Sequence, residues 1–161
     1  MVFIDGTNLF QRLRSAKLKL RLLKPAMTQL TGRRKLSRVY LYTSPHRLEE
    51  ANAYHAPDWL EGIRVVLGDS IQRGDGSFKE KAVDALLVAD LVYHAAQKNC
   101  DYAVLVAHDT DYRYAIRRVE DFGCRSAVAA FCIDAPDRLR YECDDYRLVT
   151  VEQLAGLTVS E

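Results

Sequence analysis

The stretch Val104-Leu105-Val106-Ala107-His108-Asp109-Thr110-Asp111 decides the fold of this chain. It begins with an apolar run of strand length, and two aspartates follow within five residues. The chain starts in the same way, since Val2-Phe3-Ile4 is followed directly by Asp5. If the two strands lie parallel in one sheet, both carboxyl ends open on the same edge, where open α/β sheets bind their ligands. We therefore expect the three aspartates to lie close together.

Carboxylates gathered at one edge of a sheet repel one another. The repulsion is relieved when one carboxylate takes up a proton or when a divalent cation binds. The cluster therefore predicts a site for Mg²⁺ or Mn²⁺. An aspartate that follows a strand is often only a helix N-cap. That alternative fits Asp5 or Asp109 alone, but it explains the whole set poorly.

Apolar strand-length runs alternate with helical patterns along most of the chain. Parallel strands need crossover connections, which are usually helices, so this alternation predicts an α/β fold with helices on both faces of a mainly parallel sheet. Strands are expected at residues 2–4, 38–42, 63–67, 102–107, 125–131 and 146–151, and helices at 8–23, 47–60, 79–97 and 110–122. Pro25 is expected to end the first helix, and a basic loop should follow it.

The glycine-rich segment 68–78 is expected to form a flexible loop. The helix from Lys79 to Gln97 then follows, and its first turns direct Asp84 toward the strand ends. Lys81 lies three residues before Asp84, so the two should share a helix face and point at the same cleft. Asp90 is a weaker candidate because it lies about 240° around the helix from Asp84.

Length and composition favour one domain over residues 1–161, with a core at about 1–133 and a peripheral C-terminal segment. The apolar runs are shorter than the roughly 18 residues that cross a bilayer, and Asp5 interrupts the first run, unlike a signal peptide. The four cysteines show no C-x-x-C pair and are expected to be reduced thiols. We therefore expect a cytoplasmic protein without a membrane partner, and homo-oligomerisation is left open.

Positive charge is concentrated near the start of the chain. No Asp or Glu occurs from Gly6 to Leu48, whereas this segment carries eleven Lys and Arg residues, Arg12 among them. Lys and Arg hold phosphate backbones, so a positive surface beside a carboxylate-metal site would attract nucleic acid. The alternative is a solvated surface whose acidic partners come from elsewhere in the fold.

Three segments resemble the motifs of NYN domains, a group of PIN-like ribonucleases found in bacteria, archaea and eukaryotes. They are Phe3-Ile4-Asp5-Gly6-Thr7-Asn8, Lys81-Ala82-Val83-Asp84 and Val104 to Tyr112. Their order and spacing span most of the chain. The resemblance implies a PIN-like (Rossmann-like) three-layer α/β/α sandwich with a mainly parallel sheet of five or six strands.

The resemblance also implies which residues do the chemistry. Asp5, Asp84, Asp109 and Asp111 would hold Mg²⁺ or Mn²⁺. Asn8 matches the family's asparagine near the first aspartate, and Thr110 matches a small hydroxyl residue. His108 stands where glycine is common and Ala107 where serine is common. The imidazole would narrow the cleft, contact the substrate or shuttle a proton.

Phosphodiester hydrolysis needs an activated water and stabilisation of charge on the phosphoryl and leaving oxygens, which carboxylate-held metal ions provide. The expected function is a metal-dependent endoribonuclease that cuts single-stranded or loop RNA. The expected substrate-binding residues are Asn8, Lys81, Thr110, His108 and Arg12. Asn8 would be an orienting hydrogen-bond partner, and Lys81 would contact a substrate phosphate or temper the carboxylate charge. The alternative is an RNA-binding or regulatory module with little turnover. A phosphatase of the haloacid-dehalogenase type is disfavoured, because Phe3 occupies the position of that family's nucleophile.

Overall fold

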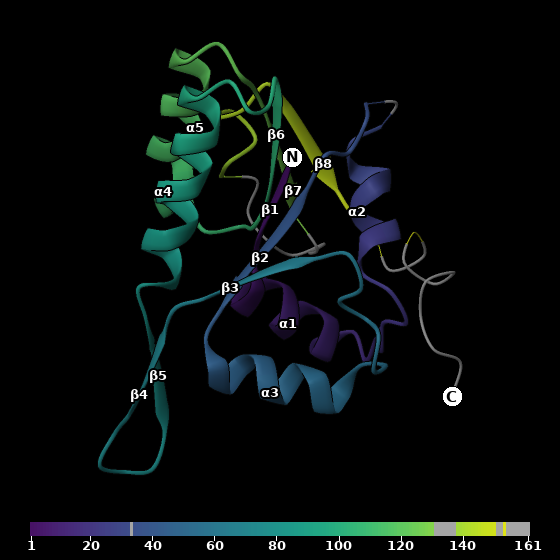
Figure 1. Ribbon diagram of the computed structural model, residues 1–161, viewed down its shortest axis with the longest axis vertical. Helices are drawn as coiled ribbons and strands as arrows, with labels where there is room; N and C mark the ends of the chain where they lie inside the picture. The colour runs from purple at the N-terminus through teal and green to yellow at the C-terminus, as the bar shows by residue number, and fades with distance from the viewer. Residues whose placement is uncertain (33, 131–137, 151–152, 154–161) are drawn as a thin grey trace.

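The structure is a computed structural model that describes residues 1–32, 34–130, 138–150 and 153. Six parallel strands form a central sheet in the order β3-β2-β1-β6-β7-β8 (Figure 1). These strands are β1 (Val2–Asp5), β2 (Val39–Thr43), β3 (Arg64–Leu67), β6 (Tyr102–Val106), β7 (Arg125–Ala130) and β8 (Asp145–Leu148). The expected mainly parallel α/β fold is therefore confirmed. Residues 131 and 151 of the expected strands lie outside the described residues.

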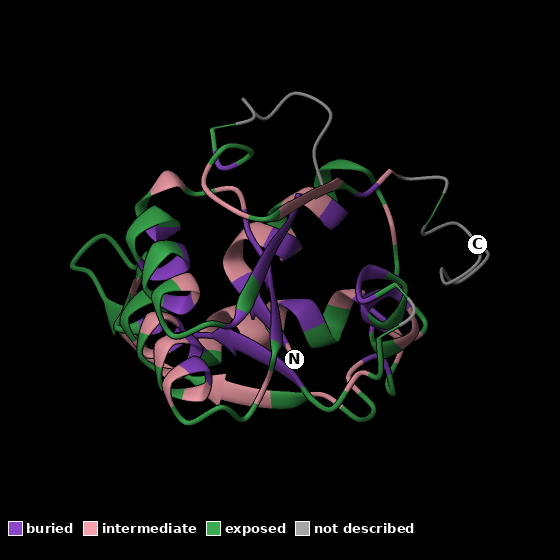
Figure 2. Ribbon diagram, turned by 90° about the horizontal axis from the view of Figure 1, so that it is seen from above, coloured by how far each residue is buried: buried purple, intermediate pink, exposed green. Residues whose placement is uncertain are grey.

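Helices cover both faces of the sheet, which gives the expected three layers (Figures 1 and 2). One face packs against α4 and α5, and the other packs against α1, α2 and α3. The helices are α1 (Gly6–Ser15), α2 (Lys24–Leu30), α3 (Pro45–Tyr54), α4 (Val83–Ala96) and α5 (Arg113–Asp121), with a short 3₁₀ turn, η1 (Thr110–Tyr112), before α5. Among the described residues, no helix is long and apolar enough to cross a membrane.

Strand β1 shows why the sheet needs both helical layers. Val2 and Ile4 pack into the core beneath α1 and α2, while Phe3 between them packs into the opposite core beneath α4 and α5. This division follows from the two-residue period of a strand. Burial on both faces also explains why the sequence of β1 is a continuous apolar run rather than an alternating one.

The segment expected to be a flexible loop is a β-hairpin, so that prediction was wrong. Strands β4 (Asp69–Gln72) and β5 (Phe78–Lys81) pair antiparallel and project from the body of the molecule (Figure 1). The turn is ordered by Asp75, which accepts hydrogen bonds from the backbone N–H and hydroxyl of Ser77. Gly76 adopts a φ of 81° there, a conformation that glycine tolerates.

Helix boundaries also differ from the expected ones, and α3 ends at Tyr54 instead of at residue 60. Helix α1 ends at Ser15 instead of about Leu23, and α2 occupies part of the expected basic loop. Pro25 lies in the first turn of α2, where its missing N–H costs nothing, rather than at the end of α1. Helix α4 begins at Val83 because β5 extends to Lys81 and Ala82 adopts a left-handed conformation.

Cys100, Cys124 and Cys143 are free thiols, as expected, and Cys132 lies outside the described residues.

Candidate functional site

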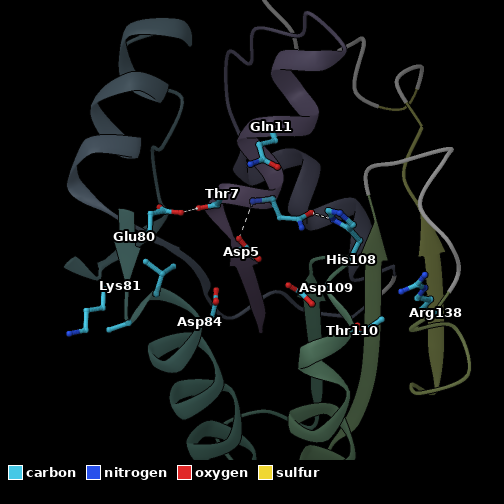
Figure 3. A pocket seen from close by; sticks show the side chains of 13 residues that line it. Asp5, Thr7, Gln11, Glu80, Lys81, Asp84, His108, Asp109, Thr110 and Arg138 are labelled. Atoms are coloured by element: carbon cyan, nitrogen blue, oxygen red, sulfur yellow. Dashed lines mark hydrogen bonds between the residues drawn. The ribbon is translucent and has the colours of Figure 1, made fainter. Parts of the chain in front are cut away.

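A cavity of about 550 Å³ opens at the carboxyl ends of β1 and β6 (Figure 3). This is the edge of the sheet where the sequence places its aspartates. The cavity is lined by Asp5, Thr7, Asn8, Gln11, Glu80, Lys81, Ala82, Val83, Asp84, His108, Asp109, Thr110 and Arg138. Three separated segments, after β1, after β6 and from β5 into α4, therefore meet at one place, as the motifs predict.

Asp5 ends β1 and also caps α1. One carboxylate oxygen accepts a hydrogen bond of 3.0 Å from the backbone N–H of Asn8. Glycine at position 6 lets the start of α1 lie close against β2, because a Cβ atom there would lie 2.6 Å from the carbonyl oxygen of Tyr42. Burial raises the pKa of Asp5 to about 6; repulsion from Asp84 and Glu80 adds to this, and the hydrogen bonds oppose it. The N-cap and site interpretations of Asp5 are thus compatible.

The hydroxyl group of Tyr112 joins two of the carboxylates. It lies 3.1 Å from an oxygen of Asp5 and 3.0 Å from an oxygen of Asp84. Burial is the main cause that raises the pKa of Tyr112 far above its ordinary value, and the negative charges of Asp5 and Asp84 raise it further. The phenol therefore stays protonated. A phenol has one proton to donate, so it satisfies one of the two oxygens fully at any moment. Tyr112 thereby fixes the relative positions of Asp5 and Asp84.

Asp84 and Asp109 complete the acidic lining. Asp84 lies in the first turn of α4, and Asp109 follows β6 and caps η1 by accepting a 3.0 Å hydrogen bond from the backbone N–H of Asp111. In Figure 3 the carboxylates of Asp5, Asp84 and Asp109 face the same space. Asp111 is exposed and is not among the residues that line the cavity.

His108 is held by two residues of α1. Its Nδ1 is hydrogen-bonded to the side-chain oxygen of Asn8, and its Nε2 lies 3.0 Å from a guanidinium nitrogen of Arg12. Because guanidinium only donates, Nε2 must accept, and the single ring proton is on Nδ1. Burial and the Arg12 charge lower the pKa of His108, which favours this neutral form. Both nitrogens are therefore occupied, which argues against the proton-shuttle interpretation. Arg12 itself does not line the cavity.

Glu80 is a site residue that the sequence reasoning missed. It accepts hydrogen bonds from the hydroxyl groups of Thr7 and Ser44, which tie β5 to the starts of α1 and α3. Lys81 also lines the cavity, but it lies on β5 and extends away from the carboxylates (Figure 3). The expectation that it shares a helix face with Asp84 was wrong, because α4 begins two residues later. Arg138 lies on another side of the cavity (Figure 3).

The basic segment divides between two ends of the molecule. Arg12 contacts His108, and Arg14 and Arg47 line a crevice between α1 and α3 beside the cavity. Arg34 and Lys35 lie instead beside Met1 and Tyr102, at the amino end of the sheet. Only part of this positive charge is therefore placed to meet a ligand of the cavity.

Carboxylates outnumber cations in the lining. Asp5, Glu80, Asp84 and Asp109 are opposed by Lys81 and Arg138. Within the described part of the chain, no three Asp, Glu, His or Cys side chains are close enough to form a ready metal site. Mg²⁺ usually takes only one or two protein carboxylates and keeps waters or phosphate oxygens as its other ligands. The donor chemistry of the cavity fits such an ion.

The NYN domain family matches residues 1–150, and the chain belongs to this family of PIN-like nuclease domains. PIN-like nucleases generally use divalent metals and act on RNA. No curated protein matches the chain. Its fold is similar to the crystal structure of a protein of unknown function from Vibrio parahaemolyticus, with 17% identity and a TM-score of 0.67 over 92% of this chain and 90% of the other. That likeness shows the fold alone.

Proposed function

We propose that this protein is a Mg²⁺- or Mn²⁺-dependent endoribonuclease that hydrolyses phosphodiester bonds of single-stranded or loop RNA. The observation that carries the proposal is the convergence of Asp5, Asp84 and Asp109 on one cavity at the carboxyl edge of the sheet. Membership of the NYN family supports the reaction class. We expect products with 5′-phosphate and 3′-hydroxyl ends.

Asp5, Asp84 and Asp109 would hold the ion, with Asp111 as a further ligand through water. When bound there, a divalent ion supplies positive charge to the phosphoryl oxygens and lowers the pKa of the attacking water. Tyr112 keeps two of the carboxylates in place. Asn8 accepts from His108 and is thereby oriented at the mouth of the site.

The remaining lining residues would bind RNA. Arg138 lies at the cavity and can pair with a phosphate, and Thr110 can donate a hydrogen bond. Lys81 points away from the carboxylates, so we assign it to a phosphate further along the strand rather than to the one that is cut. His108 and Arg12 act mainly on each other and on Asn8, and so shape the site from behind.

A second candidate is an RNA-binding module with little turnover. The observation that favours it is the spacing of the carboxylates, since no three acidic side chains of the described residues are already gathered around an ion position. Such a module would bind RNA equally well in chelator, with an affinity set by salt.

The test is cleavage of end-labelled single-stranded RNA, with matched DNA, in Mg²⁺, in Mn²⁺ and in chelator. The nuclease proposal expects RNA to be cut only with metal, to be left with 5′-phosphate ends, and to remain intact with Asp109→Asn. Binding without cutting by both proteins, in every condition, would overturn it in favour of the binding module.

A further inference from the structure

A second, smaller hollow continues from the carboxylate cavity. It is a crevice of about 110 Å³ between α1 and α3, and Thr7 and Gln11 line both spaces. The remaining lining residues are Phe10, Arg14, Arg47, Glu50, Ala51, Tyr54 and His55. A chain bound across the carboxylates would therefore have a side pocket within reach of its next unit.

The walls of the crevice are apolar and aromatic, and they are fixed by packing. Phe10 and His55 both pack against Trp59, with ring centroids 5.7 Å and 4.5 Å away. Tyr54 contacts His55 edge-on at 5.0 Å. An apolar cavity of roughly 150 Å³ accepts a benzene ring. The crevice is smaller than that, at about 110 Å³, but it is not enclosed, so it can take the leading edge of one flat ring and not a folded peptide segment.

Three of its polar side chains, those of His55, Arg14 and Arg47, carry N–H donors. The Nδ1 of buried His55 accepts from the backbone N–H of Leu20 at 3.1 Å, so the neutral ring carries its proton on Nε2. Among the described residues, that Nε2–H has no hydrogen-bond partner. Arg14 and Arg47 add guanidinium donors. Glu50 is an acceptor, but it is paired with Arg47 at 2.9 Å.

We propose that the α1–α3 crevice binds one base of the RNA strand beside the phosphate that is cut, and that it prefers uracil. The proposal rests on the proposed nuclease function. Single-stranded RNA is recognised by splayed bases that stack on aromatic side chains and are read at their edges. The edge of a single ring fits the space, and uracil carries at C4 a carbonyl oxygen that can accept from these donors, where cytosine carries an amino group that is itself a donor. Arg14, which is exposed at the crevice, can meet the negative charge of the neighbouring backbone.

Binding can be tested without turnover, because Trp59 is the only tryptophan and touches two walls of the crevice. In chelator, uridine monophosphate should quench tryptophan fluorescence saturably. Cytidine monophosphate should do so more weakly, and ribose 5-phosphate, which has no base, should not. Equal quenching by ribose 5-phosphate would overturn the proposal.

Two pairs of variants locate the binding. Tyr54→Leu keeps apolar bulk but removes the flat ring, and should weaken uridine monophosphate binding roughly tenfold, whereas Tyr54→Phe should not. Arg14→Ala changes an exposed rim residue and should weaken binding several-fold; Lys35→Ala, at the opposite end of the sheet, should not. Unchanged affinity in both Tyr54→Leu and Arg14→Ala would contradict the assignment.

Cleavage mapping separates this inference from the nuclease proposal. Wild type should cut mixed-sequence RNA with uracil enriched at one fixed position next to the cut bond, and Tyr54→Leu should lose that enrichment. Cutting with neither base preference nor base-dependent quenching would overturn the crevice and leave the nuclease intact. Base-dependent quenching without cutting would overturn the nuclease and leave the crevice as part of a binding module.

Discussion

The hydroxyl group of Tyr112 lies between the carboxylates of Asp5 and Asp84. Tyr112→Phe should lower the free energy of unfolding by about 2 kcal/mol, because a buried donor to charged groups is lost. It should also reduce cleavage about tenfold or more, the usual cost of losing a residue that orients a ligand. Urea unfolding and cleavage rates measure the two effects. Tyr141→Phe, at a residue 90% exposed, is the control and should change neither. If the two variants unfolded and cleaved alike, Tyr112 would have no role in the site.

Asp5 should make stability depend on pH in the direction opposite to that of a carboxylate whose pKa is lowered by folding. Its pKa rises from 3.8 to about 6 in the folded protein, so the folded state binds its proton more tightly than the unfolded state. The stability that this proton contributes is therefore fully present below pH 3.8 and is lost as pH rises through about 6. The loss is about 3 kcal/mol, at 1.4 kcal/mol per pKa unit.

The test is urea unfolding in chelator on both sides of this range. Asp5→Asn, which stays neutral, should be more stable than wild type at about pH 7.5 and should lose that advantage at about pH 4. Because metal and proton compete for the same carboxylate, Mn²⁺ binding by wild type should strengthen as pH rises through about 6. A wild-type stability that rises between pH 4 and pH 7 relative to Asp5→Asn would contradict this account.

The β4–β5 hairpin is the element that completes the cavity from outside the sheet. Glu80 joins it to α1 and α3 through Thr7 and Ser44. Glu80→Ala should therefore speed hydrogen exchange of the amides of residues 69–81 about tenfold or more while leaving the sheet amides unchanged, since local opening needs only local contacts to be lost. Lys79→Ala, on an exposed position of the same strand, is the matched control. Exchange unaffected by Glu80→Ala would show that the hairpin is held by its own strands.

The sequence predicts well those elements that local residue patterns determine. The apolar strands before Asp5 and Asp109 can be recognised from the sequence, because a strand buried on both faces needs a continuous run of apolar residues. The hairpin strands are polar and flanked by glycines, so they resemble a loop, and they form because a turn and neighbouring helices support them.

Contacts between residues distant in sequence could not be predicted from local patterns. Tyr112 reaches an oxygen 107 residues away in Asp5, and Glu80 reaches Thr7 across 73 residues. Neither residue differs in type or spacing from an ordinary helix or strand residue, so only the fold reveals the role. Tyr112 stands directly after Asp111 in the third motif, which is the one signal that could have drawn attention to it.

Across the whole molecule, the cations of the N-terminal segment are placed unequally with respect to the cavity. Arg14 lies at the crevice beside it, whereas Lys35 lies at the amino end of the sheet. RNA binding in chelator should weaken with salt, and Arg14→Ala should reduce the slope of log affinity against log salt by about one, as for one lost phosphate contact. Lys35→Ala should leave slope and affinity unchanged. Equal losses in the two variants would indicate binding by general positive charge and not along the carboxyl edge.

The central claim is that the carboxylates at the carboxyl edge hold the metal that cuts RNA. The most direct measurement is the rate of RNA cleavage against Mn²⁺ concentration for wild type, Asp109→Asn and Asp84→Asn. The account predicts a rate that saturates with Mn²⁺ in wild type and falls about a hundredfold or more in both variants, with folding intact by thermal unfolding. A wild-type rate that is independent of Mn²⁺, or variants that cut as fast as wild type, would contradict it.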